Sequence, residues 1–307
     1  MSKKLTISVV GLGMVGGSLK KYFEKQDDIQ LFFYDKFKEI GSIKEVMNGE
    51  FIYICVPTPF DENKGCDTSI IEEVIDEINK IDRFVSSLRK KIIIKSTVIP
   101  GTTERLQKKY PDLQILFNPE FLTEVTADQD TSYPDRQLIG YTKKSYNIAK
   151  DVLLQLPLAP FERLMPATEA EMIKYASNCW FATKVTYANQ IYDLCQELIL
   201  DYDFVLEGLA ADKRIGKTHL KIFHHGYRGF GGKCLPKDLK SLLVFAEQNK
   251  VYLSLLQTAN DYNDKLLQQQ DLKPLNTENS SLVKQKEEKK YIDSEELKVK
   301  DDAKLKI

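Results

Sequence analysis

The sequence lacks an excess of charge of either sign. It holds 44 Lys and Arg against 45 Asp and Glu, which leaves a formal net charge of -1 over 307 residues. A protein that grips nucleic acid through its phosphates needs surplus Lys and Arg, so this balance gives no reason to expect nucleic acid as a partner. The hydrophobic share of 42% is enough to bury two modest cores. The composition therefore predicts a soluble protein that acts on small molecules.

The sequence also lacks a long hydrophobic run near its start. The apolar stretch Leu5–Val10 is too short for a secretion signal or a membrane span, and it leads directly into a glycine turn. Neither a membrane partner nor export is expected from this segment.

Cysteine is scarce, and no C-x-x-C pair occurs. The five cysteines form an odd, scattered set: Cys55, Cys66, Cys179, Cys195 and Cys234. This pattern argues against a disulfide framework and against a structural zinc site, so no metal is expected. A reducing cytoplasm is the expected location.

Residues 271–307 lack glycine and have Tyr291 as their single aromatic residue, with nine Lys against nine Asp and Glu. Such a segment cannot bury enough apolar surface to fold alone. It is predicted to be a charged, disordered tail or a frayed helix, with a binding role as the alternative. The sequence shows no internal repeat.

Residues 1–165 alternate apolar, β-rich runs with amphipathic segments. A helix is predicted over 70–88, and the expected strands are 5–10, 30–34, 51–56, 91–97 and 114–117. Alternation of this kind predicts a parallel sheet covered by helices.

Residues 166–270 are predicted to be helical and to begin with a long helix from Thr168 to about Leu200. Thr168 is expected to cap this helix, with Glu171 as its reciprocal partner three residues later. An apolar stripe recurs every three or four residues and would face a partner helix or a second subunit. Its members are Tyr175, Cys179, Ala182, Val185, Ala188, Tyr192, Cys195 and Ile199. Cys179 and Cys195 are therefore expected to be packing residues.

A G-x-G-x-x-G pattern, Gly11 to Gly16, follows the first predicted strand and opens a predicted helix. In a dinucleotide-binding site, the first glycine makes the tight turn, Gly13 lets the backbone approach a pyrophosphate, and Gly16 lets helix and strand pack closely. Asp35 ends the second strand, 19 positions after Gly16. It would accept hydrogen bonds from ribose hydroxyls and favours NAD over NADP, although the neighbouring Lys36 weakens that preference.

The next two loops end at the same edge of the predicted sheet. Pro57 and Thr58 follow the third strand and Thr97 ends the fourth, so both loops face the edge where cofactors bind. The full set of predicted cofactor contacts is Gly11, Gly13, Met14, Val15, Gly16, Asp35, Lys36, Pro57, Thr58, Thr97 and Lys237. The predicted fold class is α/β: an N-terminal Rossmann-type dinucleotide-binding domain and an all-α central domain built on a long dimerisation helix.

The run 229–238 places Cys234 among glycines, with Lys237 and Asp238 shortly after it. Glycines let the backbone approach a bound molecule, and a nearby cation such as Lys233 or Lys237 favours the reactive thiolate. A glycine-rich loop with an inert thiol is the alternative reading of the same residues.

Several separated blocks, in order, resemble the nucleotide-sugar 6-dehydrogenases that oxidise UDP-glucose or GDP-mannose. They are residues 11–16 with Asp35, 95–97 with 100–102, 118–124, 133–136, 169–171 with Lys174 and Asn178, 212–216, and the block around Cys234. The resemblance spans residues 5 to about 268. Among members of this family, UDP-glucose oxidation is the expected activity.

The resemblance implies a four-electron oxidation of the sugar C6 alcohol to a carboxylate with two NAD molecules. Cys234 would form a thiohemiacetal and then a thioester, which water hydrolyses. Lys174 and Asn178, four residues apart on one helix, would stabilise the oxyanion. Asp238 would hold or deprotonate the water, Glu124 would assist hydrolysis of the thioester, and Thr97 would help to order the water.

The resemblance also implies how the substrate is held. The predicted substrate contacts are Glu120, Phe121, Leu122, Glu124, Lys174, Asn178, Arg214, Tyr227, Gly231 and Gly232. Glu120 is equally well explained as a brace of its own loop. Arg214 would reach across a homodimer, and Arg214, Tyr227, Arg228 and Lys233 would supply donors to the pyrophosphate. His219, His224 and His225 match no catalytic position, and a solvent-facing turn is expected there.

The sequence departs from the family in two places. Where the family continues into a second Rossmann-like domain that binds the nucleotide, only the charged tail stands, and the segment 36–50 is short. The identity of the nucleotide sugar therefore stays open among UDP-glucose, GDP-mannose and UDP-N-acetylhexosamines. Two other functions remain as alternatives: a regulatory or impaired NAD-binding homologue, and a two-electron dehydrogenase of the 3-hydroxyacid type.

Overall fold

The computed structural model describes residues 4–85, 90–224 and 226–272, which form two compact units that divide within one helix, between Ala176 and Ser177. The predicted tail lies outside the described residues from position 273 onward, and His225 lies outside them too. Within the described ranges, no helix is both long enough and apolar enough to cross a bilayer.

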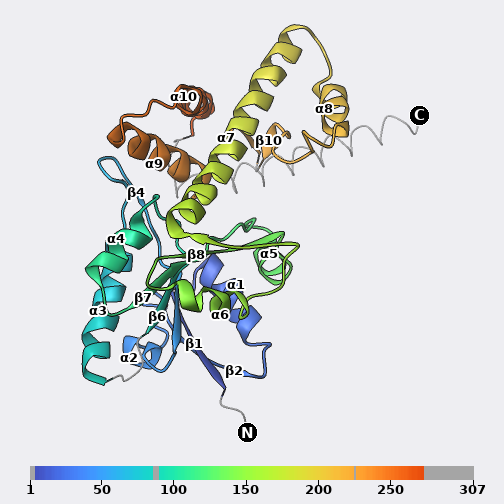
Figure 1. Ribbon diagram of the computed structural model, residues 1–307. Coiled ribbons are helices and arrows are strands. Elements are labelled where there is room, and N and C mark those ends of the chain that lie inside the picture. The colour runs from blue at the N-terminus through green and yellow to red at the C-terminus, as the bar shows by residue number, and fades with distance from the viewer. Residues whose placement is uncertain (1–3, 86–89, 225, 273–307) are drawn as a thin grey trace. The chain divides into compact units, whose positions relative to one another are not determined.

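The first unit is a seven-stranded sheet with helices on both faces (Figure 1). The strands lie in the order β2-β1-β3-β6-β7-β8-β9, and every neighbouring pair is parallel except β7 with β8. Their bounds are β1 Leu5–Val10, β2 Ile29–Tyr34, β3 Phe51–Ile54, β6 Lys91–Ile94, β7 Gln114–Phe117, β8 Arg136–Tyr141 and β9 Phe161–Pro166. A separate hairpin joins β4 (Phe60–Asp61) to β5 (Gly65–Cys66).

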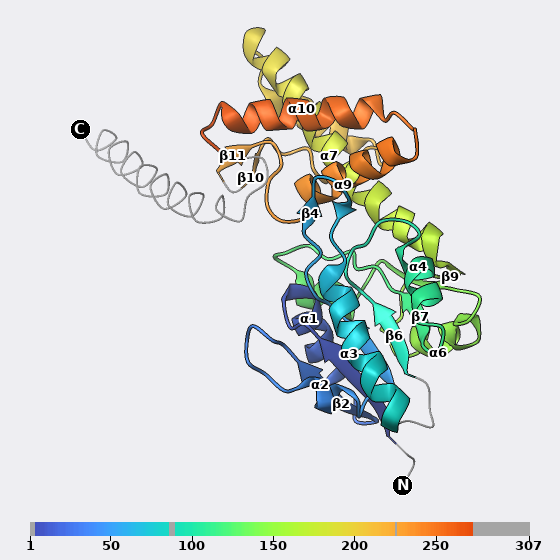
Figure 2. The ribbon, with the colours of Figure 1, turned by 90° about the vertical axis from the view of Figure 1, so that its left-hand side faces the viewer.

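Two apolar cores cover the two faces of this sheet because its central strands carry apolar residues on both sides. On one face pack α2 (Ile43–Val46), α3 (Ser69–Val85), α4 (Thr102–Lys109) and the start of α7, and in Figure 2 α3 runs along this face. On the other face pack α1 (Met14–Phe23), the short 3-10 turn η1 (Tyr146–Ile148) and α6 (Ala149–Leu153). The remaining helix, α5 (Ala127–Ser132), lies against α1.

The second unit is helical, as predicted. Its helices are the rest of α7 (Ala167–Glu197), α8 (Tyr202–Ala211), α9 (Leu235–Gln248) and α10 (Ser254–Gln268), and a hairpin pairs β10 (Phe223–His224) with β11 (Tyr227–Arg228). The predicted burial of Cys179 and Cys195 is confirmed, with 2% and 4% of their surface exposed. The predicted α/β class with a helical region after it is therefore confirmed.

Three local predictions need correction. The third and fourth strands end at Ile54 and Ile94, because the chain turns into loops after Cys55 and Lys95 donate the last sheet-like backbone hydrogen bonds. Strands β8 and β9 were not predicted. They alternate less cleanly, and much of β9 is exposed as an edge strand.

The expected cap of the long helix is also wrong. The helix begins at Ala167, so Thr168 lies inside its first turn. The Glu171 carboxylate does not return to Thr168 but accepts hydrogen bonds from Gly101 and Thr103. The local spacing predicted a capping interaction between Thr168 and Glu171, but Glu171 instead bonds to residues far away in sequence.

Candidate active site

The loop between β1 and α1 has the conformation that a dinucleotide fingerprint requires. Gly11 has φ +84°, and its N–H donates to Tyr34 O at 2.8 Å. A Cβ on Gly16 would lie 1.8 Å from Gly11 O, so helix and strand approach more closely than a side chain permits. At Gly13, the N-cap of α1, an added Cβ would meet nothing within 4 Å. This open space at a helix N-terminus fits a pyrophosphate.

These two glycines permit a matched test. We expect Gly16→Ala to lower the free energy of unfolding by about 1–3 kcal/mol, because the backbone of Gly11 must move. Gly13→Ala is expected to leave stability unchanged and to weaken NAD binding, because its methyl group enters the space for the pyrophosphate. Thermal unfolding and NAD titration of both variants measure the difference; equal effects of the two on stability would contradict it.

Asp35 is held against the glycine loop. Its carboxylate accepts from Leu12 N at 2.7 Å and from the N–H groups of Phe37 and Lys38 at 3.0 Å. Burial alone would raise the pKa of Asp35, but these hydrogen bonds outweigh it and hold the pKa below its ordinary value. A carboxylate offers about four acceptor positions, so one remains for a ribose hydroxyl. Lys36 is exposed beside it.

Lys38 was not singled out from the sequence. Its Nζ donates to Leu12 O at 2.6 Å, so the turn after β2 holds both the N–H and the carbonyl of Leu12. A lysine three residues after the carboxylate that is predicted to bind ribose was the available signal.

The two neighbouring loops at this edge are joined through a threonine. Thr58 is buried, and its hydroxyl donates to Thr97 O at 2.7 Å. Pro57 beside it is exposed, while Thr97 is half-buried. The hydroxyl of Thr58 thus ties the third-strand loop to the fourth-strand loop.

Predicted substrate residues of the first unit gather around a buried ion pair. Lys174 Nζ lies 2.7 Å from Glu120 Oε1, and the two side chains are 5% and 9% exposed. The other oxygen of Glu120 accepts from Leu122 N at 2.7 Å. Burial opposes ionisation of Glu120, yet Lys174 and the Leu122 N–H hold its pKa below the ordinary value. Glu120 therefore both braces its loop and pairs with the predicted catalytic lysine.

Two cationic side chains lie near the aromatic ring of Phe121. The guanidinium of Arg136 lies 3.6 Å from the ring centroid, and Lys174 Nζ lies 5.6 Å from it. Glu124, at the end of the same loop, is exposed to solvent. Its predicted role as a catalytic base stays a prediction.

Lys95 is a buried cation to which sequence reasoning gave no role. Its Nζ donates to Asn118 Oδ1 at 2.7 Å, and the amide of Asn118 donates in turn to Leu138 O at 2.9 Å. Burial lowers the pKa of Lys95, while the charge of Glu120 opposes the shift. A charged residue directly after an apolar strand was the signal that pointed to this position.

In the second unit, Cys234 stands at the N-terminus of α9, where the helix dipole favours negative charge on the sulfur. One turn later, Asp238 is 1% exposed. Its two oxygens accept from Asn178 Nδ2 and from Lys237 Nζ, each at 2.5 Å. Asp238 of α9 is therefore in direct contact with Asn178 of α7 and with its neighbour Lys237, one turn after the N-cap Cys234.

The glycines before Cys234 are held by a residue that the sequence did not reveal. Asn263 on α10 is 2% exposed; it accepts from Phe230 N at 2.8 Å and donates to Phe230 O at 2.9 Å. Gly229 has φ +89°, and a Cβ there would lie 2.6 Å from the amide oxygen of Asn263. Gly232 has φ +75°. Only glycine adopts such angles without strain, so the backbone conformation of this loop requires glycine at these two positions.

The predicted substrate residues Gly231 and Arg214 have different surroundings. A Cβ on Gly231 would lie 2.5 Å from the hydroxyl of Tyr227, so that ring stands over the loop. Arg214 is 90% exposed and makes its ion pair with Asp212.

The guanidinium of Arg228 contacts side chains of α7. Its guanidinium pairs with Asp193, bonds to Asn189 Oδ1 at 3.1 Å and lies 4.7 Å from the ring of Tyr192. Arg228 thus anchors β11 to α7 through its Nε and Nη2 groups.

Two of the three histidines, His219 and His224, lie in the described part of the chain, and both are exposed. His219 is exposed, with φ +66°, and its ring stacks on Phe181 at 4.2 Å between centroids. His224 is exposed in β10. Lys233 is exposed next to Cys234.

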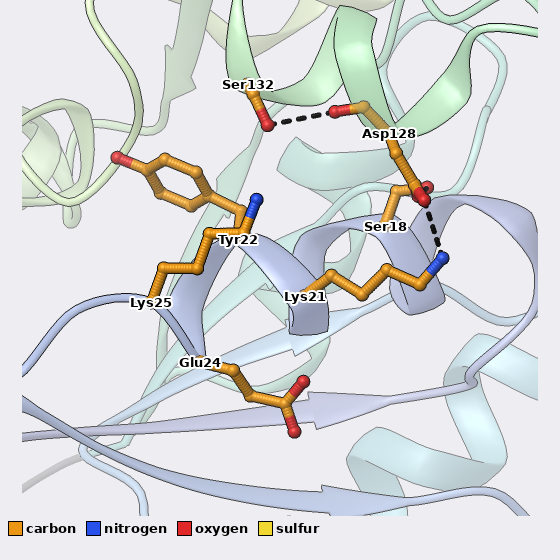
Figure 3. A pocket seen from close by; sticks show the side chains of 7 residues that line it. All are labelled: Ser18, Lys21, Tyr22, Glu24, Lys25, Asp128 and Ser132. Carbon is orange, nitrogen blue, oxygen red and sulfur yellow. Dashed lines mark hydrogen bonds and ion pairs between the residues drawn. The ribbon is translucent and has the colours of Figure 1, made fainter.

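A surface cavity of about 290 Å³ lies between α1 and α5 (Figure 3). Its lining residues are Ser18, Lys21, Tyr22, Glu24, Lys25, Asp128 and Ser132. Asp128 accepts from Ser18 at 2.6 Å and pairs with Lys21 at 2.5 Å. None of the predicted site residues lines this cavity, so it is separate from the candidate active site.

Comparison with known proteins decides the family. Residues 35–156 match the NAD-binding domain of the UDP-glucose/GDP-mannose dehydrogenase family, and residues 168–265 match its central domain. Together the two matches cover more than half of the chain. The chain belongs to the UDP-glucose/GDP-mannose dehydrogenase family. The predicted resemblance is thereby confirmed, and the match to the family's NAD-binding domain confirms NAD as the predicted cofactor.

Similar proteins support the same assignment. A UDP-glucose 6-dehydrogenase of Rickettsia bellii is 32% identical over 249 residues, which is 78% of this chain and 54% of that protein. One of Pseudomonas aeruginosa is 36% identical over 219 residues, which is 66% of this chain and 45% of that protein. The chain thus spans about half the length of these curated relatives.

A solved structure of a UDP-glucose dehydrogenase from the archaeon Pyrobaculum islandicum superposes with a TM-score of 0.75 at 26% identity. That likeness covers 88% of this chain and 72% of the other. It extends across both the sheet and the helical region of this family member.

Proposed function

We propose that this member of the dehydrogenase family oxidises a nucleotide sugar, UDP-glucose first among the candidates, at C6 to the carboxylate. The observation that supports the proposal is the surroundings of the residues that we predict to react. A buried lysine is paired with Glu120 in the unit with the dinucleotide fold, and Cys234 begins a helix that also carries the buried Asp238. Such a set serves covalent catalysis at a carbonyl carbon.

NAD, when bound, would accept one hydride in each of two oxidations. The glycine loop and Asp35 fit this cofactor, because the space at Gly13 is open and the carboxylate of Asp35 faces the loop. The remaining residues proposed to contact it are Lys36, Pro57, Thr58, Thr97 and Lys237. The domains proposed are residues 1–165 for the cofactor, 166–270 for the central region, and 271–307 as a tail.

The chemistry proposed for the chain's own residues balances in four steps. The C6 alcohol loses a hydride and a proton and becomes an aldehyde; the sulfur of Cys234 then adds to its carbonyl carbon and the oxygen takes a proton. Loss of a second hydride and that proton leaves a thioester, whose C–S bond is broken by water to give the acid and the thiol. Lys174 and Asn178 would stabilise the oxyanions, and Asp238 would hold or deprotonate the water.

A homodimer is proposed on the basis of exposed apolar side chains along α7 and α8. Large apolar residues are 52–60% exposed at helical spacing along α7 and just after it: Trp180, Tyr187, Leu194 and Leu198. Phe204 of α8 is 75% exposed. Exposed apolar side chains of this kind are typical of protein interfaces. In such a dimer, Arg214 would reach the substrate of the partner subunit.

All five cysteines lie in the described ranges and none is in a disulfide, which supports the proposed reducing cytoplasm.

A panel of nucleotide sugars tests this function. The purified chain is incubated with NAD and UDP-glucose, GDP-mannose or a UDP-N-acetylhexosamine, and NADH absorbance is followed. We expect sustained NADH formation with one of them, and UDP-glucose to give the highest kcat/KM. A protein that binds NAD but reduces none with any nucleotide sugar contradicts the proposal and favours a regulatory role.

A further inference from the structure

The N-terminus of helix α4 is capped by a residue from outside that helix. Its own N-cap is Gly101, which has φ +90° and no side chain to accept the first backbone N–H groups. Unmet donors at a helix start are costly when buried, so another acceptor is needed there.

Glu171 of α7 supplies that acceptor. Its Oε2 accepts from Gly101 N at 2.6 Å, and its Oε1 accepts from Thr103 N at 2.8 Å and from Thr103 Oγ1 at 2.6 Å. The side chain has no solvent exposure. Burial raises the pKa of Glu171 to about 7, while the three donors oppose that rise. The interaction joins segments about 70 residues apart in sequence.

The first turn of α7 is held from a second side by Gly140 of β8. A Cβ at Gly140 would lie 2.9 Å from Ala167 Cα and 3.1 Å from Ala170 Cβ. The helix start therefore rests directly on the sheet, and Ala167 and Ala170 are completely buried. Because Glu171 also accepts hydrogen bonds from the N-terminus of α4, the start of α7 is held by both α4 and β8.

Two predicted reactive groups depend on the position of this turn. Lys174 lies three residues after Glu171, so the two side chains leave neighbouring positions on the helix. Gly101 ends the loop that starts after β6 and includes Thr97. One carboxylate thus connects the turn that carries the lysine to the loop that carries the threonine.

We infer that Glu171 is a positioning residue, which sets Lys174 and the loop 95–101 in register for the oxidation. This inference rests on the proposed function, because Lys174 matters only if the chain performs that chemistry. Glu171 itself need not touch substrate, since a shift of about 1 Å in a catalytic group can cost about 100-fold in rate.

The test compares Glu171→Gln with Glu169→Gln, an exposed glutamate on the same helix turn. The amide of glutamine presents a donor to an N–H of α4, so one hydrogen bond is lost while the side-chain shape is kept. We expect kcat to fall about 10- to 100-fold in Glu171→Gln and to stay unchanged in Glu169→Gln. Thr103→Ala, which removes only the hydroxyl donor, is a milder second variant that should fold and lose several-fold in kcat.

A double-mutant cycle separates positioning from stability. In a Lys174→Ala background, Glu171→Gln should cause a smaller fall in kcat than in the wild-type chain, because one of the two groups that it positions is gone. If the two losses in kcat multiply, or if Glu171→Gln lowers the melting temperature with kcat intact, the inference is overturned.

Hydrogen exchange keeps the test independent of turnover. Glu171→Gln should speed amide exchange both at Gly101 and Thr103 and in the first turn of α7. Faster exchange in α4 alone would overturn the inference. Absence of NADH formation by the wild-type chain, in contrast, would reject the proposed function and leave this exchange result to decide on Glu171.

Discussion

Replacing Cys234 by serine is expected to lower steady-state NADH formation by about 1,000-fold or more, because a serine hydroxyl is a far weaker nucleophile at neutral pH. Cys234 begins α9, so its sulfur lies at the end of the helix that favours negative charge. A hydroxyl at the same place gains little from that field, since it stays protonated. The first oxidation needs no covalent bond, so any NADH that the variant forms should not exceed one per sugar.

Glu247, an exposed residue near the C-terminal end of the same helix, provides the control for this substitution. Glu247→Gln changes α9 without removing the sulfur, and we expect its turnover to stay within a few-fold of the wild-type value. Both variants should keep the wild-type melting temperature, because both side chains are exposed. Turnover of Cys234→Ser within threefold of wild type would show that the thiol is not the nucleophile.

Replacing Lys174 by methionine is expected to harm stability and catalysis together. The pair with Glu120 is 2.7 Å long and almost completely buried. Removing the cation leaves the carboxylate buried without its partner, which typically lowers the free energy of unfolding by about 3–5 kcal/mol. Loss of an oxyanion-stabilising group typically lowers kcat by about 100- to 1,000-fold.

A second substitution separates the two losses. Adding Glu120→Gln to Lys174→Met removes the unpaired charge, so most of the lost stability should return, because a neutral buried pair is often no less stable than the ion pair. The rate should not return, because the cation is still missing. Thermal unfolding and NADH kinetics of the single and double variants measure both quantities. Recovery of activity in the double variant would show that Lys174 acts only as the partner of Glu120.

Much of the first unit could be predicted because its signals are local. The strand 5–10, the glycine loop and Asp35 follow one another within a single β-α-β unit, where each pattern constrains the next. The positions of Cys234, Lys174 and Asn178 were named from motifs that the family carries. The parts of the fold that escaped prediction share a different cause.

The missed features depend on partners distant in sequence. Glu171 looks like the second half of a local capping pattern, yet its burial against α4 gives it donors from Gly101 and Thr103. Asn263 lies in an amphipathic helix with no motif, and only the folded chain brings it to Phe230. Tertiary contacts of this kind override local propensity, so neither could be read from spacing alone.

The most direct test of the central claim counts NADH against product in a single reaction. A limiting amount of the nucleotide sugar is oxidised to completion, the NADH is quantified by absorbance, and acid-quenched samples are digested for mass analysis of the peptide with Cys234. We predict two NADH per sugar, a carboxylate product and a trapped acyl adduct on Cys234. One NADH per sugar, with an aldehyde or ketone product and no adduct on that thiol, would contradict covalent four-electron oxidation and favour a two-electron dehydrogenase.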